Sequence, residues 1–220
     1  MNKPAQNPAS RRHILKAAAK LFASRGYDAV SVREIVESAG VTKPVLYYYF
    51  ENKEGVARAL INDFFDQADA LRQDVFGRET DVHGLLVEYT SEMLQLARKH
   101  RETLAFAFSI WFGRTSLKEL IRHAEKYDCK VHAEWVETLG RRGLSPDTSQ
   151  RLVLSYWSML LHELLKVAQF PQTPDIECLS QEMSHLALYG ALSAPPVSPC
   201  RRPGQETVTA KTEKSPRKQP

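Results

Sequence analysis

The chain has 220 residues, 43% of them hydrophobic and 25% charged, which is the balance of a soluble globular protein long enough to bury a sizeable core. No stretch approaches the ~18 consecutive apolar residues of a membrane span, and no apolar run follows the basic N-terminus as it would in a signal peptide. These features argue against a membrane protein and predict a cytoplasmic one.

The formal net charge of +4 is unevenly distributed along the chain. Residues 1–56 carry nine basic and five acidic side chains, residues 57–196 carry 15 and 19, and residues 197–220 carry six and two. A surface that binds a polyanion such as DNA is therefore expected at the ends of the chain rather than in its middle.

Apolar residues recur with the helical period along the chain, and no segment shows the alternation of a strand. A first helix is predicted over residues 10–24, with Gly26 as its C-terminal stop. Ser31 and Glu34 have the spacing of a capping box that begins a second helix, and Gly40 ends that helix.

A third short helix is predicted after Thr42, with Pro44 in its first turn, where the missing amide hydrogen costs nothing. Asn52 is placed to cap a fourth helix. The second and third helices meet across residues 39–42, a turn too tight for an antiparallel hairpin. This arrangement is typical of a helix-turn-helix motif.

Longer helices are predicted beyond this motif, over residues 53–75, 82–99, 101–112, 116–141, 146–169 and 175–192. The resulting fold class is all-α, with a flexible N-terminus at 1–9, a three-helix helix-turn-helix domain at 10–53, a second helical domain at 54–193 and a basic tail at 194–220. The tail lacks aromatic residues and is predicted to be disordered. Its segment 214–218 resembles Ser-Pro-basic motifs that lie in the DNA minor groove, although a solubilising role explains the same composition.

The segment Gly40–Glu54, which reads GVTKPVLYYYFENKE, closely resembles the signature of the TetR family of transcriptional regulators. The segment ILKAAAKLF at 14–22, followed by Arg25-Gly26-Tyr27, resembles it too. The similarity covers residues 11–60 and is only architectural beyond them, where it implies that residues 54–193 form a ligand-sensing and dimerisation domain. It implies a cytoplasmic, nucleoid-associated homodimer that represses transcription from a palindromic double-stranded DNA operator until a small apolar or aromatic effector releases it. The alternatives are an activator, or a constitutive or architectural DNA-binding protein with no ligand response.

The resemblance and the chemistry of base recognition together assign the DNA contacts. Lys43 can donate to guanine acceptors or to phosphate, while Tyr47, Tyr48 and Lys53 match phosphate contacts of the family. Tyr49 is expected to be mainly structural. The predicted DNA-binding residues are Ser31, Arg33, Thr42, Lys43, Pro44, Val45, Tyr47, Tyr48 and Lys53.

Wide apolar arcs on the last two predicted helices indicate a four-helix interface between two subunits, with one large monomeric core as the alternative. Such a dimer presents two recognition helices to successive major grooves, about 34–36 Å apart. The predicted interface residues are Tyr156, Trp157, Leu160, Leu164, Met183, Leu186, Ala187 and Gly190.

The helices between these two regions hold many aromatic residues, and the resemblance implies that they enclose an apolar pocket whose occupant moves the fourth helix. Aromatic residues at helical spacing are also what an ordinary core contains. The predicted pocket residues are Phe65, Phe108, Trp111, Tyr127, His132 and Trp135.

Motifs of the common enzyme and cofactor sites are missing, including GxSxG, HExxH, the P-loop and GxGxxG, so neither catalysis nor a cofactor is expected. Glu125, Cys129 and His132 lie at i, i+4 and i+7 on one helical face and could bind a transition metal if a fourth ligand came from elsewhere. An exposed polar face explains the same three residues, and no metal is predicted.

Overall fold

The computed structural model describes residues 8–113, 116–170 and 175–190, and within these ranges the regular structure is entirely α-helical, which confirms the predicted fold class. The predicted tail at 194–220 and most of the predicted flexible segment at 1–9 lie outside the described residues. The helices are α1 (Pro8–Arg25), α2 (Val32–Ala39), α3 (Lys43–Phe50), α4 (Lys53–Phe76), α5 (Val82–Lys99), α6 (Arg101–Phe112), α7 (Lys118–Arg141), α8 (Pro146–Gln169) and α9 (Ile176–Tyr189).

The helix boundaries follow the capping residues that the sequence contains. The Ser31 hydroxyl accepts a hydrogen bond from the Glu34 amide at 3.3 Å, and the Glu34 carboxylate accepts one from the Ser31 amide at 2.8 Å. Asn52 Oδ1 accepts from the Gly55 amide at 2.7 Å and so caps α4. Two predicted starts differ from the structure: α1 begins at Pro8 rather than near residue 10, and α7 begins after Leu117 rather than at the serine before it.

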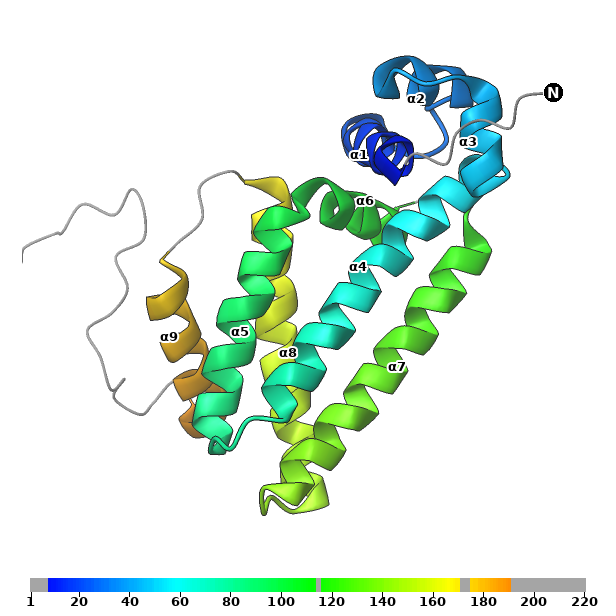
Figure 1. Cartoon of the computed structure of the whole chain (residues 1–220). Coiled ribbons are helices and arrows are strands. Elements are labelled where there is room, and N and C mark those ends of the chain that lie inside the picture. Colours follow the sequence, from blue (N-terminus) through cyan, green and yellow to red (C-terminus); the bar gives the residue numbers. More distant parts are fainter. Residues whose placement is uncertain (1–7, 114–115, 171–174, 191–220) are drawn as a thin grey trace, which may run out of the picture.

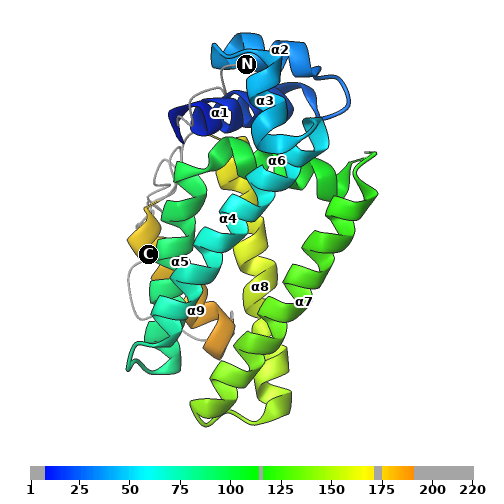
Figure 2. The same ribbon diagram turned by 45° about the vertical axis from the view of Figure 1, so that its right-hand side comes forward.

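Figure 1 shows α4, α5, α7 and α8 running side by side along the long axis of the molecule, with α1, α2 and α3 gathered at one end. We call α1–α3 the head and the remaining helices the body. Helix α6 lies under α1 where the two parts meet, and α9 packs against α5 and α8 (Figures 1 and 2). The helix-turn-helix is therefore carried on the end of a helical bundle.

Two apolar cores hold the fold together, and the first does not end where the predicted head domain ends. The core of the head takes in Phe22 and Leu46, but also Val56 and Leu60 from α4 and Phe106 from α6. The rings of Phe22 and Phe106 lie 4.9 Å apart. The first turns of α4 and part of α6 thus join the head to the body by packing. The predicted domain boundary at residue 53 therefore does not coincide with the edge of this core.

An ion cluster around the buried Arg72 joins α4 to α7 in the body. The Arg72 side chain is 1% exposed and pairs with Asp69 at 2.8 Å and with Glu134 at 2.7 Å. The Tyr127 hydroxyl donates to the Asp69 carboxylate at 2.7 Å. Burial opposes the charge on Arg72, but its hydrogen bonds to Tyr127 and Asp69 outweigh this and raise its pKa. Helix α4 is therefore held at its lower end to α7 and at its upper end to the head.

Candidate nucleic-acid interface

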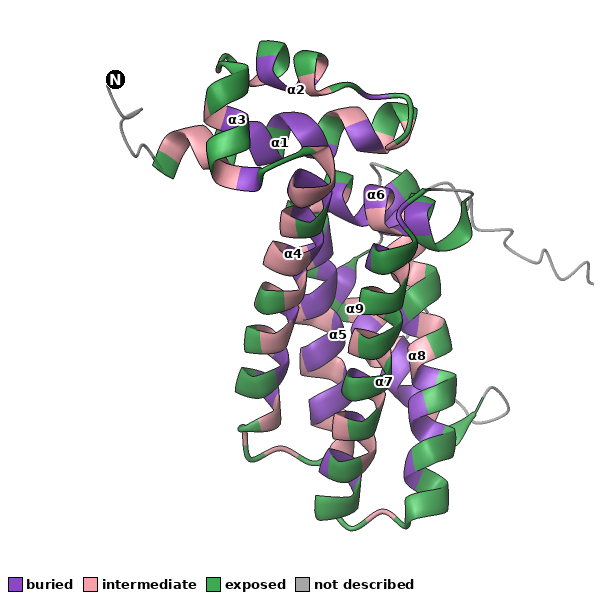
Figure 3. Cartoon of the chain, turned by 90° about the vertical axis from the view of Figure 1, so that its right-hand side faces the viewer, coloured by how far each residue is buried: buried purple, intermediate pink, exposed green. Residues whose placement is uncertain are grey.

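Helix α3 has one face packed into the head and one face open to solvent (Figure 3). Leu46 and Phe50 are buried in the core of the head, and Val45 packs half-buried against it. The open face includes two large aromatic side chains, Tyr47 at 46% and Tyr48 at 45% exposed. The predicted contacts that the structure leaves exposed on or beside α3 are Thr42, Lys43, Pro44, Tyr47 and Tyr48.

Tyr49 differs from the two tyrosines before it. It is half-buried, packs against the core of the head, and meets the Tyr48 ring edge to face at a centroid distance of 5.0 Å. Its position agrees with the structural role expected for it. Aromatic pairs of this geometry add about 0.5–1.5 kcal/mol beyond the area they bury, so Tyr49 also steadies the neighbouring exposed ring.

Ser31 and Arg33 are exposed at the start of α2, but each already has an intramolecular partner. The Ser31 hydroxyl lies 2.7 Å from Glu34 Oε2, and Arg33 Nε donates to Glu37 Oε1 at 2.6 Å. Hydrogen bonds from the Ser31 amide and hydroxyl, together with Arg25, lower the pKa of Glu34 to about 2. A fixed negative charge therefore lies at the start of α2, and a phosphate contact there must compete with it.

Lys53, which was predicted to contact phosphate, has partners within the chain. Its Nζ donates to the carbonyl oxygens of Tyr27 at 3.0 Å and Val30 at 2.8 Å, and it lies 4.1 Å from the centroid of the Tyr27 ring. Burial lowers the pKa of this ammonium group. Since two of its three N–H donors are used, Lys53 mainly anchors the loop between α1 and α2 to the start of α4.

The junction between α3 and α4 is a tight turn that the sequence analysis did not identify. Glu51 has φ 60° and ψ −42°, and the Asn52 amide donates to the Phe50 carbonyl at 2.6 Å, which closes a γ-turn of a strained kind. A Cβ atom placed on Gly55 would overlap the Phe50 carbonyl oxygen. Helix α3 therefore rests directly on the backbone of α4, and the signal for this in the sequence is a glycine in the first turn of a helix.

A second tie between the head and α4 runs through Arg11. Its guanidinium donates to both carboxylate oxygens of Asp63, at 2.8 and 2.9 Å, and its central carbon lies 5.8 Å from the Phe50 ring centroid. Two-pronged pairs of this kind fix orientation as well as adding energy. Any displacement of α4 is thus passed to α1 as well as to α3.

His100, between α5 and α6, gives the stability of the fold a predictable pH dependence. Burial, and then the neighbouring Lys99, lower its pKa below the usual value of 6.5, while Asp63 opposes them. The unfolded chain therefore binds a proton at a higher pH than the folded chain, and the free energy of unfolding should fall as the pH drops below about 6.5.

Urea unfolding between pH 7.5 and 5.5 measures this effect, and His100→Gln is expected to flatten the slope. The exposed His13 offers a matched control, whose replacement by Gln should leave the slope unchanged. If the free energy of unfolding falls as steeply with pH in the His100 variant as in the parent protein, the acid sensitivity arises from other groups.

The residues predicted for the ligand pocket lie in separate parts of the described structure. Trp135 is fully buried, and its ring lies 4.8 Å from those of both Phe76 and Tyr89. Phe65 and Trp111 line a cavity of about 40 Å³, far below the ~300 Å³ at which ligand pockets begin. Aromatic side chains from α4, α5, α7 and α8 fill the interior that was expected to be hollow.

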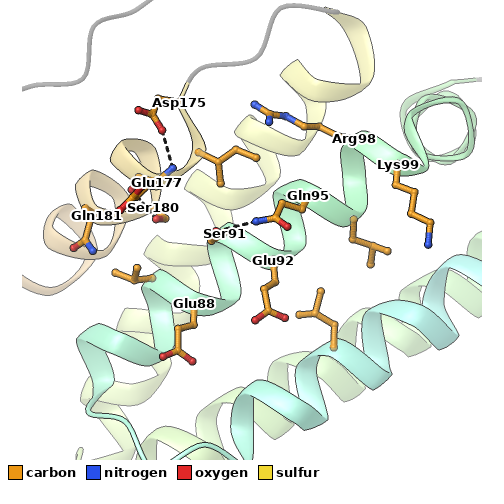
Figure 4. Close-up of a pocket in the computed structure, with 14 residues that line it drawn as sticks. Glu88, Ser91, Glu92, Gln95, Arg98, Lys99, Asp175, Glu177, Ser180 and Gln181 are labelled. Atoms are coloured by element: carbon orange, nitrogen blue, oxygen red, sulfur yellow. Dashed lines mark hydrogen bonds between the residues drawn. The ribbon is translucent and has the colours of Figure 1, made fainter.

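The three remaining pocket candidates are also separated. Phe108 lines a groove between α6 and α8, while Tyr127 stacks on Phe65 at 3.8 Å and is held by the Arg72 cluster. His132 is half-buried on α7. A groove of about 1230 Å³ does exist elsewhere, between α5 and α9, and Figure 4 shows the polar side chains among its lining residues. Two of these, Glu88 and Glu92, pair with Arg78 at 3.0 and 2.7 Å. The groove contains none of the predicted residues.

Three of the predicted interface residues belong to the interior of the body. Tyr156, Leu160 and Met183 are buried, and the Tyr156 hydroxyl lies 2.7 Å from that of Thr90 on α5. They face inward because α8 packs against α5, α6 and α7, so a wide apolar arc has both a core side and an outer side. The others are at least partly accessible: Trp157, Leu164, Leu186, Ala187 and Gly190.

The three residues considered above as possible metal ligands lie on α7. Glu125 and Cys129 are exposed and His132 is half-buried, and no group of three or more His, Cys, Asp or Glu residues in the described ranges is arranged to hold a metal ion. Within the same ranges, none of the helices has the length and apolar character needed to cross a membrane.

Comparison with known proteins links this head to one family. Residues 14–60 match the family model of bacterial regulatory proteins, tetR family. An uncharacterized HTH-type transcriptional regulator of Bacillus subtilis, YdgC, is 39% identical over 88 residues, which cover 40% of this chain and 43% of that protein. The HTH-type transcriptional repressor KstR2 of Mycolicibacterium smegmatis is 45% identical over 60 residues, 27% of this chain and 29% of that protein.

The similarity of sequence thus covers less than half the length of these two relatives. The likeness of fold extends further. A TetR-like transcriptional regulator from Rhodococcus sp. RHA1 superposes with a TM-score of 0.68 at 15% sequence identity, over 81% of this chain and 93% of that one. The head is therefore shared in sequence and the body in architecture.

Proposed function

Since the chain belongs, through its N-terminal module, to the tetR family of bacterial regulatory proteins, we propose that it is a sequence-specific DNA-binding regulator of transcription. It acts as a cytoplasmic repressor that binds a palindromic operator as a homodimer and is released by a small molecule. The observation that carries this proposal is the exposed start of α3, where Thr42, Lys43 and Pro44 are open to solvent on a helix anchored by Leu46 and Phe50.

The chemistry of this surface suits the major groove. Lys43 donates hydrogen bonds to guanine acceptors, and the ring of Pro44 offers an apolar contact to a thymine methyl group. Tyr47 and Tyr48 are exposed on the same helix. In this proposal their hydroxyls donate to phosphate oxygens, which orients the helix without reading sequence. Base readout therefore rests on the first turn of α3.

Helices α8 and α9 pack against each other. We propose that the faces they turn away from the body form the homodimer interface. Trp157, Leu161 and Leu164 are spaced along one face of α8, and Leu161 is exposed although it is apolar. Two small residues, Ala187 near the end of α9 and Gly190 just after it, allow close approach of a second helix pair. The core residues Tyr156, Leu160 and Met183 play no part in this interface.

Release by a ligand requires that the ligand prefer one conformation of the head relative to the body. The route for such coupling is α4, because its start contacts α3 at Gly55, its middle binds α1 through Asp63 and its end is held by Arg72. The alternative, constitutive DNA binding, needs no such route.

The test is selection of binding sites by the purified chain from a library of random duplex DNA at physiological salt. We expect a palindromic consensus whose half-sites are centred about 10–10.5 base pairs apart, or a multiple of this. A pool with no consensus after selection would refute sequence-specific recognition. A consensus with a single half-site would refute binding as a symmetric dimer.

A further inference from the structure

A cavity of about 350 Å³ lies between α1, α4 and the junction of α5 with α6, at the place where the head meets the body. We call it the waist cavity. Among its lining residues Leu15, Leu60 and Phe64 are nearly buried, whereas Lys16 and Lys99 are exposed. The inner wall is therefore apolar and the opening is charged, and the volume falls within the range of small-molecule sites.

The charge at this opening is positive and not neutralised. Arg12, Lys16 and Lys20 are four residues apart, so they lie along one face of α1 about 6 Å from one to the next. Lys99 adds a fourth cation from α5, and none of these four side chains forms an ion pair with another part of the described chain.

The acidic side chains of the waist cavity do not balance this charge. Asp63 is occupied by Arg11 through both of its oxygens, which leaves Glu102 as the other carboxylate of the lining. Like charges at this spacing on a helix destabilise it slightly, by a few tenths of a kcal/mol per pair. An anion bound at the opening would remove that repulsion.

We propose that the waist cavity binds a small organic anion with an apolar body. Its carboxylate or phosphate group lies between Lys16 on α1 and Lys99 on α5, and its apolar part rests on Leu15 and Phe64. A free inorganic anion can pair with the lysines at the opening but has no apolar part to contact the inner wall. A neutral apolar molecule can contact the inner wall but has no charge to pair with the lysines.

Such a ligand connects the head to the body, because Lys16 and Lys99 belong to different parts of the molecule. Bound there, it fixes the angle of α1 against α5 and so changes the distance between the two recognition helices of a dimer. This effect on DNA rests on the proposed function, whereas binding of the anion does not.

Binding is tested on the full-length protein without DNA, by calorimetry and by the shift in melting temperature. The probes are octanoate and octyl phosphate, with 1-octanol and inorganic phosphate for comparison, all below the concentrations at which they aggregate. We expect at least one of the two amphipathic anions to bind about tenfold or more tightly than either 1-octanol or inorganic phosphate. Preference for octanoate or for octyl phosphate identifies the acid group.

Variants identify the site. Lys16→Gln and Lys99→Gln should each weaken the bound anion by about tenfold, since each removes a charge-assisted contact. Lys126→Gln, an exposed lysine on α7, is the matched control and should have no effect. Equal binding of 1-octanol, absence of binding by every probe, or unchanged affinity in both variants would overturn the proposal.

A separate titration of the selected operator with and without the bound anion measures the coupling. If the chain selects no operator but still binds the anion through Lys16 and Lys99, the proposed function fails and the waist site stands. If an operator is bound and no anion is, the waist site fails alone.

Discussion

Replacing Gly55 by alanine is expected to lower the free energy of unfolding by about 1–3 kcal/mol, as is usual when a methyl group is forced into a filled space. The added Cβ overlaps the carbonyl oxygen of Phe50, and this is backbone that no side-chain rotation can move aside. The neighbouring Glu51 already has a positive φ, so the turn has little freedom to absorb the displacement. Urea unfolding of the purified variant measures the loss.

The same substitution should reduce affinity for the operator by about tenfold or more, because α3 is pushed away from the line of α4. Gly140→Ala is the matched control, since a Cβ there meets no heavy atom within 4 Å. Alanine in place of that helical glycine is expected to stabilise the fold by up to about 1 kcal/mol and to leave DNA binding unchanged. A Gly55 variant as stable as the parent would show that the junction is not tight.

Lys43→Ala should weaken binding to the selected operator by about 1–3 kcal/mol for each half-site and relax the consensus at the base pair it contacts. Lys43 is exposed and forms no ion pair within the described residues, so the free energy of unfolding should change by less than about 0.5 kcal/mol. Fluorescence anisotropy with operator and random duplexes, beside urea unfolding, separates the two effects.

Tyr47→Phe provides the contrast, because its hydroxyl is proposed to contact phosphate. It should lower affinity for operator and random duplex alike, by about 0.5–1.5 kcal/mol for the lost hydrogen bond. If Lys43→Ala also weakens both duplexes equally, Lys43 binds phosphate and the readout of sequence lies elsewhere on α3.

The sequence by itself determined the features that depend on near neighbours in the chain. The capping box of Ser31 and Glu34, the cap at Asn52 and the stop at Gly40 each act within one helical turn. The helical period separates Leu46 and Phe50 from the exposed Tyr47 and Tyr48 for the same reason. These local rules were enough to place the helix ends to within a few residues and to find α3.

Tertiary structure decided which partner each long side chain meets. Lys53 was predicted to hold phosphate, yet it binds the carbonyls of Tyr27 and Val30, which lie more than twenty residues away. Trp135 was predicted to line a pocket, yet rings from other helices surround it. A lysine can bind phosphate or backbone carbonyls, and a tryptophan can line a pocket or fill a core. Only the packing of distant helices decides which role each residue has.

The same limit applies to Tyr156, Leu160 and Met183, whose apolar spacing fits an interface and a core equally well. Periodicity shows that a helix face is buried but not what buries it, because that depends on how many helices pack around it. The waist cavity is a result of this kind, since it brings Lys16 beside Lys99 from opposite ends of the first hundred residues. Short-range sequence patterns therefore predict the helices, whereas the candidate sites depend on contacts between helices.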